Sequence, residues 1–160
     1  MLYNFKLQRI FLPLKKKIRG IGKCRFAAIL TGREEVPVVV DTLDTALATY
    51  QLRNDNEDLK YSVKVTDIDK IKEVHIDIGK PVEKADVVAE MYKSATPFCK
   101  VLSNLCKGNI TSQQLKGPLK GKDTHELIKK IEKGEDYVDI VTEDNPNGKV
   151  RVKIKKLPSS

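Results

Sequence analysis

Two glycines and the cations around them are the residues best suited to chemistry in this chain of 160 residues. Gly20 and Gly22 flank Ile21, and glycine reaches backbone angles that let a phosphate approach the main chain closely. A helix that begins after such a turn presents free N–H groups and the positive end of its dipole to that phosphate. Cationic side chains surround the turn, namely Lys15, Lys16, Lys17, Arg19, Lys23 and Arg25. The pattern is typical of a helix–hairpin–helix turn and predicts contact with a nucleic-acid backbone; a tight turn with a solvated basic face is the alternative.

The charge distribution also favours an anionic partner. The formal net charge is +8, and nine basic residues with no acidic residue lie between Met1 and Arg33. The other 21 basic residues are balanced by 22 acidic residues, so the positive charge is concentrated near the start of the chain. Such a local concentration favours a nucleic-acid contact over general solubility. The same acid-free, amphipathic start also fits a mitochondrial transit peptide.

The remaining reactive side chains form no catalytic or metal-binding motif in the sequence. His75 and His125 are far apart, and His125-Glu126 lacks the second histidine of a metalloprotease motif. We therefore expect no catalytic residue, no metal and no cofactor, and we expect that the protein is not an enzyme. The cysteines form no CxxC pair and are expected to be buried free thiols in a reducing compartment: Cys24, Cys99 and Cys106.

Hydrophobic spacing predicts the elements that would position these groups. Apolar residues recur at helical intervals over 7–18, 23–30, 43–50 and 82–105, which predicts four helical segments. The span 58–74 stays open between helix and strand, because its tyrosine and valines alternate as they do in strands.

The clearest helix signal lies after the loop 113–124. Asp123 is placed to cap a helix, and Glu126 stands in the capping-box position three residues later. Gly134 follows the last apolar residue of the helical pattern and is expected to end the helix.

A β-hairpin is predicted directly after this helix. The strands are expected over 137–143 and 149–157, with the turn at 145–148. Basic and apolar residues alternate in the second strand, which predicts either a solvated face or an RNA contact through Arg151 and Lys153. The same alternation at 61–80 echoes this segment, and a true repeat would make both segments hairpins.

The glycine turn resembles the central motif of ribosomal protein S-thirteen of the small subunit. The similarity includes Ile18 before the turn and Ile29-Leu30 after it, and the opening Met1-Leu2-Tyr3 is similar to organellar members of the family. It covers roughly residues 1–74 and favours a helix for 58–74. A weaker similarity at 115–124, to the tail of the family that contacts RNA, adds Lys116, Lys120 and Lys122 as RNA contacts.

The resemblance implies a mainly α fold. A helix–hairpin–helix or helix-two-turn-helix domain would be followed by a C-terminal helix and β-hairpin extension, which makes the fold α+β overall. The expected division is an RNA-binding helical domain over 1–80, a helical insertion and basic loop over 81–122, and the helix and hairpin over 123–160.

The function implied by the resemblance is that of a structural protein in the small subunit of the mitochondrial ribosome. Its implied partners are ribosomal RNA, S-nineteen-like head proteins, an L-five-like protein at the intersubunit bridge and the peptidyl-site tRNA, with no membrane. The expected location is the mitochondrial matrix, with the cytoplasm as the alternative. Two other functions stay open: a helix–hairpin–helix DNA-binding protein of viral or repair origin, and a protein-interaction module that uses 82–105.

Overall fold

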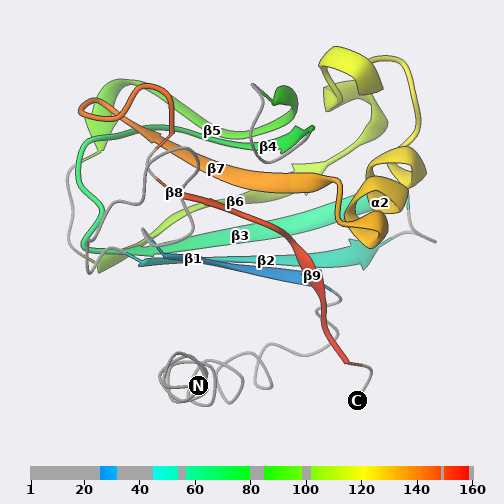
Figure 1. Cartoon of the computed structure of the whole chain (residues 1–160), viewed down its shortest axis with the longest axis horizontal. Coiled ribbons are helices and arrows are strands. Elements are labelled where there is room, and N and C mark those ends of the chain that lie inside the picture. The colour runs from blue at the N-terminus through cyan, green and yellow to red at the C-terminus, as the bar shows by residue number, and fades with distance from the viewer. Residues whose placement is uncertain are drawn as a thin grey trace.

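The structure is a computed structural model, and the residues that it describes form two antiparallel β-sheets with one α-helix beside them (Figure 1). It describes residues 26–31, 45–53, 57–79, 85–98, 102–148 and 150–158. The prediction of a mainly α fold with a β-hairpin extension is therefore wrong, because the described residues before the C-terminal helix form strands.

The first sheet has five strands in the order β6-β3-β2-β1-β9. Each neighbouring pair is antiparallel, and β2 and β3 pair along their full lengths. The strands are β1 (Phe26–Thr31), β2 (Thr45–Arg53), β3 (Asp58–Thr66), β6 (Leu102–Ile110) and the short β9 (Lys155–Lys156).

The second sheet has four strands in the order β5-β4-β7-β8. The chain changes sheets after β3, β5, β6 and β8, so both sheets contain early and late parts of the sequence. The strands are β4 (Ile71–Ile78), β5 (Asp86–Phe98), β7 (Asp136–Thr142) and β8 (Val150–Val152).

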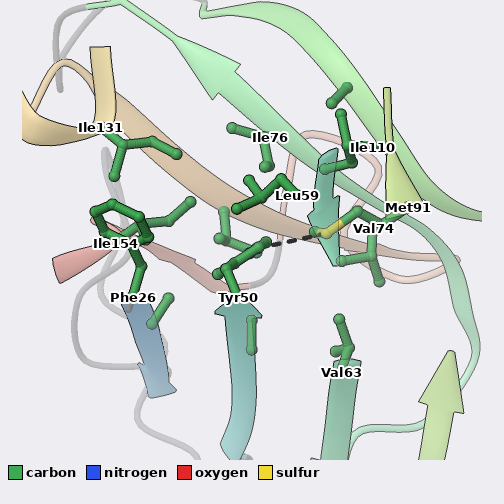
Figure 2. Packing of buried hydrophobic residues seen from close by; sticks show 14 of the residues in the cluster. Phe26, Tyr50, Leu59, Val63, Val74, Ile76, Met91, Ile110, Ile131 and Ile154 are labelled. Atoms are coloured by element: carbon green, nitrogen blue, oxygen red, sulfur yellow. Dashed lines mark hydrogen bonds between the residues drawn. The ribbon is translucent and has the colours of Figure 1, made fainter. Parts of the chain in front are cut away.

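One hydrophobic core lies between the two sheets (Figure 2). Leu59 and Val63 of the first sheet and Val74 and Ile76 of the second sheet have no exposed surface. Tyr50 is equally buried, and its hydroxyl donates a hydrogen bond to Met91 Sδ at 3.4 Å, as Figure 2 shows. This bond satisfies a polar group that would otherwise be buried without a partner.

The helix predicted after Asp123 is confirmed as α2 (Thr124–Lys133). It ends at Gly134, which adopts a left-handed conformation with φ of 69°. The predicted capping box does not form: the Asp123 side chain makes no capping hydrogen bond, and Glu126 pairs with Lys129 at 2.7 Å. Two 3₁₀ turns, η3 (Ser112–Gln114) and η4 (Gly117–Leu119), lie in the predicted loop before it.

Several predicted helices are strands in the structure. The spans 23–30 and 43–50 contain most of β1 and most of β2, and 82–105 contains β5 with the start of β6. The span 58–74 contains β3 and part of β4. In β2 the residues 46–50 are buried without interruption, so both faces of the strand are covered. A short, continuous apolar run of this kind fits helical spacing as well as a doubly buried strand. The predicted helix 7–18 lies outside the described residues.

The predicted C-terminal hairpin is confirmed in part. Val138 of β7 pairs with Val152 of β8, as the hairpin requires. The second strand is interrupted, however, and its continuation is β9, which pairs with β1 in the other sheet. The echoed segment 61–80 forms no such hairpin, because β3 and β4 lie in different sheets.

Strand pairing joins residues of the predicted first domain, 1–80, to residues of the predicted last domain, 123–160. β4 pairs with β7, and β1 pairs with β9. The division into 1–80, 81–122 and 123–160 itself stays a prediction. Within the described residues, no helix is long and apolar enough to cross a membrane.

Candidate metal centre

A row of polar side chains crosses the outer face of the second sheet. Side chains alternate along a strand, and Val74 and Ile76 of β4 belong to the core between the sheets. Glu73, His75 and Asp77 therefore lie on the opposite face of β4. Along the chain they occupy every second position, which places all three on one side of the sheet.

The register of the sheet extends this row to the neighbouring strands. His75 of β4 is paired with Asp139 of β7, and Asp139 is paired in turn with Arg151 of β8. On the other side, His75 is paired with Glu90 of β5. Four strands thus each contribute one charged or titratable side chain to a single line across the sheet.

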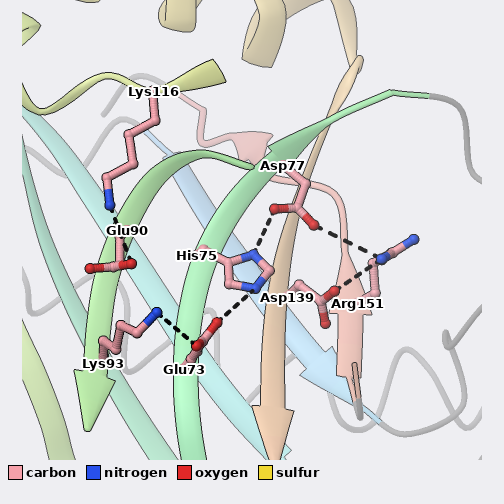
Figure 3. Close-up of polar contacts among 8 residues, drawn as sticks. All are labelled: Glu73, His75, Asp77, Glu90, Lys93, Lys116, Asp139 and Arg151. Carbon is pink, nitrogen blue, oxygen red and sulfur yellow. Dashed lines mark hydrogen bonds and ion pairs between the residues drawn. The ribbon is translucent and has the colours of Figure 1, made fainter. Parts of the chain in front are cut away.

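These side chains form a close network of polar contacts (Figure 3). His75 Nδ1 lies 2.6 Å from Asp77 Oδ1, and a carboxylate can only accept, so the imidazole donates this hydrogen bond. Arg151 Nη2 donates to Asp139 Oδ2 at 3.0 Å and lies 3.9 Å from Asp77 Oδ2. The guanidinium therefore bridges the two carboxylates through their Oδ2 atoms.

The centre of the network is enclosed. The side chains of Asp77 and Asp139 are each 3% exposed, that of His75 is 9% exposed and that of Arg151 is 13% exposed. Asp139 Oδ1 is buried and has no hydrogen-bond partner. An unpartnered oxygen on a buried carboxyl is energetically costly, and it leaves one donor atom in the cluster available to a cation.

Burial and neighbouring charges act on the two titratable groups at the centre. Burial alone would lower the pKa of His75, but the hydrogen bond and charge of Asp77, with Asp139 and Glu73 beyond it, raise this pKa. Burial raises the pKa of Asp139, although Arg151 opposes that rise. The imidazole is thus surrounded by more negative than positive charge.

The rim of the network is exposed and ion-paired. Glu73 Oε2 lies 4.0 Å from His75 Nε2, and Glu73 Oε1 pairs with Lys93 at 3.1 Å. Lys116 pairs with Glu90 at 3.3 Å on the same side of the sheet, as Figure 3 shows. Both pairs involve a residue of β5, at the edge of the sheet next to the buried centre.

The buried centre has the composition of a cation site. His75, Asp77 and Asp139 each offer one donor atom, and these three atoms lie within 4.8 Å of one another. One imidazole nitrogen and two carboxylate oxygens match the mixed ligands used for first-row divalent metals. The sequence indicated no such cluster, because its members are separated along the chain and are joined only by strand register.

Gly148, in the turn before β8, lies against the same carboxyl. Its φ is +106°, and a β-carbon built on it would lie 2.5 Å from Asp139 Oδ1. Gly148→Ala is therefore expected to lower the free energy of unfolding by about 2–4 kcal/mol, as the sum of backbone strain and a clash with a buried carboxyl. Urea unfolding at neutral pH measures this loss.

Gly121→Ala is the matched control for that substitution. Gly121 also has a positive φ, of +76°, but a β-carbon there would meet no atom within 4 Å. This variant should show backbone strain alone and so a smaller loss. Equal losses in the two variants would mean that the side chain of residue 148 does not press on Asp139.

The residues predicted from sequence as RNA contacts do not gather in one place in the described structure. Lys116 lies beside β5, where its backbone N–H also donates to the Val88 carbonyl at 2.8 Å, and Lys120 and Lys122 are exposed in the turn before α2. Arg151 is held in the buried network, and Lys153 is exposed beyond β8. The other predicted contacts lie outside the described residues: Lys15, Lys16, Lys17, Arg19, Gly20, Ile21, Gly22, Lys23 and Arg25.

The cysteine prediction is tested at one position. Cys106, on β6, is a half-buried free thiol, and burial raises its pKa to about 12. Such a thiol is unreactive at neutral pH. Cys24 and Cys99 lie outside the described residues.

A comparison with protein families identifies one match. The model of the CHRD domain family matches residues 26–154, a range that includes α2 and every described strand except β9. No curated protein and no solved structure matches the chain.

The family match overturns the ribosomal interpretation. Since it covers most of the chain with a β-sheet family, the resemblance to S-thirteen is wrong, and so is the role in the small ribosomal subunit. The predicted partners, namely ribosomal RNA, S-nineteen-like and L-five-like proteins and tRNA, are wrong for the same reason. The helix–hairpin–helix DNA-binding alternative is likewise unsupported, because the matched region is built from strands.

Proposed function

The chain belongs to the CHRD domain family, and from this premise we propose that it is a non-enzymatic β-sandwich domain that binds one divalent transition-metal ion. The ligands are His75, Asp77 and Asp139. The observation that carries the proposal is the convergence of three buried donor atoms within 4.8 Å, one of them on a carboxyl whose second oxygen has no partner.

The donor set selects the class of metal. Imidazole nitrogen suits Zn²⁺, Co²⁺, Ni²⁺ and Fe²⁺, whereas Ca²⁺ and Mg²⁺ prefer six or more oxygen ligands. With one nitrogen and two carboxylates, Zn²⁺ is the expected ion and Co²⁺ its spectroscopic substitute. Because the ligands arise from β4 and β7, the ion would join the two central strands of the second sheet.

The burial of the donors favours a structural role over catalysis. Structural metal sites are closed by protein ligands, and catalytic sites keep a position open to solvent or substrate. The three ligand side chains are at most 9% exposed. We accordingly propose that the protein is not an enzyme and that the ion would stabilise the sheet.

A self-contained ion network is the competing explanation for the same four residues. With His75 protonated, the imidazolium and Arg151 together carry two positive charges, which balance the two carboxylates without any metal. The two explanations differ in one measurable property, because only the first requires the protein to bind a metal ion.

Isothermal titration of the EDTA-treated full chain with Zn²⁺ distinguishes the two explanations. The wild-type protein is expected to bind one equivalent, and His75→Gln to weaken binding at least about 100-fold, because one of three protein ligands is removed. His125→Gln is the matched control, since His125 is half exposed in the first turn of α2 and lies outside the cluster.

The absorption spectrum of bound Co²⁺ tests whether the metal binds at this cluster or elsewhere in the chain. A site made of nitrogen and oxygen should give ligand-field bands without the thiolate charge-transfer band that cysteine ligands produce. Loss of the spectrum in His75→Gln but not in His125→Gln supports the assignment. Absence of stoichiometric metal in the wild-type protein, or a thiolate band, would overturn it.

We further propose a mitochondrial location for the protein. Its support is the basic, acid-free start of the chain, which suits a mitochondrial protein, with the cytoplasm as the alternative. A protein-interaction role for 82–105 also stays untested, although β5 and β6 in this region are the edge strands of their sheets.

A further inference from the structure

We propose a second binding site, in which a groove between the end of α2 and the β8–β9 segment binds a small polyanion carrying two or more phosphate or sulfate groups. The groove has a volume of about 580 Å³. Its walls are the stretch 131–134 on one side and the stretch 153–156 on the other. It is separate in sequence from the ligands of the proposed metal centre, and it does not depend on them.

The rim of the groove is strongly cationic. Four of its eight lining residues are lysines and one is an acid, Glu132, which pairs with Lys156 at 3.1 Å. Three lysines remain that form no ion pair with another described residue and are exposed: Lys133, Lys153 and Lys155. These lysines lie on both walls of the groove and produce a positive potential inside it, although Glu135 lies near Lys133 and Asp136 near Lys153.

The position of Lys153 indicates a partly preorganised site. Its ammonium group lies 5.7 Å from the centre of the Tyr137 ring, a cation–π distance that restricts the side chain. Gly134 faces it without a side chain, and a β-carbon at that position would lie 3.8 Å from Lys153 Nζ. The missing side chain leaves room beside the ammonium for an anion.

The rest of the groove fits a compact ligand that has an apolar part as well as charged groups. Ile131 and Ile154 belong to the groove lining and are 3% and 2% exposed, so their buried side chains form a firm wall beneath the lysines. Lysines on an edge strand also prevent a strand of another molecule from pairing with it, and this role explains the two lysines of β9. It does not account for Lys133, which reaches the same groove from a helix.

Titration of the full chain with inorganic tripolyphosphate at 150 mM salt tests the proposal, with a sulfated disaccharide as the second probe. The triple variant K133Q/K153Q/K155Q is expected to bind at least about tenfold more weakly than wild type, since three of the groove's four cations are removed. Binding of both probes identifies a general oxyanion site, and binding of one alone identifies the chemical source of the anion.

K60Q/K64Q/K107Q is the matched control with the same change of net charge. These lysines are exposed on β3 and β6, where the sheet surface has no part in the groove lining. The control should change affinity less than about twofold. Equal losses in the two triple variants, or no binding of either probe to wild type, would overturn the proposal.

Discussion

Arg151→Gln is expected to destabilise the metal-free protein by about 3–5 kcal/mol, because the substitution leaves two buried carboxyls without their shared cation. Arg151 is 13% exposed and contacts Asp139 at 3.0 Å and Asp77 at 3.9 Å. Glutamine keeps a hydrogen-bond donor on a shorter side chain and removes the charge. The loss is measured as the free energy of urea unfolding in the presence of EDTA.

The same substitution is expected to raise the affinity for Zn²⁺ at least about tenfold. Arg151 places a positive charge beside the metal ligands, and repulsion between unit charges roughly 5 Å apart is worth about 3 kcal/mol at an effective dielectric constant of 20. Added Zn²⁺ should therefore stabilise the variant more than it stabilises wild type. Titration calorimetry measures the affinity, and thermal melts with and without Zn²⁺ measure the stabilisation.

Lys107→Gln controls for the loss of one positive charge. Lys107 is exposed on β6 in the other sheet and should change neither quantity by more than about 0.5 kcal/mol. A variant of Arg151 that loses stability but gains no affinity would assign the four residues to a purely ionic network. A variant that loses neither would show that Arg151 is not the counter-ion of the carboxyls.

Asp136→Asn is expected to stabilise the protein at pH 8 by about 2–4 kcal/mol and to have little effect near pH 4. Asp136 has no exposed surface, and burial raises its pKa to about 7, although the backbone N–H of Ile154, which donates to Oδ2 at 3.1 Å, opposes the rise. Between about pH 4 and pH 7 the folded state therefore holds a proton that the unfolded chain has already released.

The sign of the effect follows from this difference in proton binding. Below about pH 4 both states are protonated, so the carboxyl and the amide behave alike. As pH rises from about 4 to 7, only the unfolded state releases its proton, and wild-type stability falls by about 1.4 kcal/mol for each of roughly three pKa units. The amide of the variant does not titrate, and its oxygen still accepts the Ile154 N–H.

Urea unfolding at pH 4.5 and pH 8 measures the expected change. Asp144→Asn is the control, because Asp144 is exposed and pairs with Lys70 at 3.2 Å on the surface. Its effect should stay below about 1 kcal/mol at both pH values. An advantage of Asp136→Asn that is equal at the two pH values would mean that the buried carboxyl does not titrate in this range.

Elements specified by neighbouring residues were predictable from the sequence. α2 carries its own periodicity and ends at Gly134, and the turn 145–148 lies between two alternating strands. β2 was mistaken for a helix because its long buried run satisfies both periodicities, and only its pairing with β1 and β3 decides between them. That pairing is a property of the whole fold and not of the segment.

The candidate metal centre was hidden for the same reason. Glu73, His75 and Asp77 alternate along the chain, and this signal points to one polar face only if 71–78 is treated as a strand. Asp139 joins His75 through strand register across more than sixty residues of sequence. Arg151 was singled out for its charge, but as an RNA contact, because nothing in the sequence near it shows the buried carboxyls that it contacts.

The C-terminal stretch 150–156 holds the two sheets together, because it contributes one strand to each of them. β8 completes one sheet, β9 completes the other, and Ile154 between them is anchored to Asp136. A single short run of backbone is therefore hydrogen-bonded to both sheets of the sandwich. Detaching it would expose a new edge strand in each sheet at once, so one short segment closes both halves of the domain.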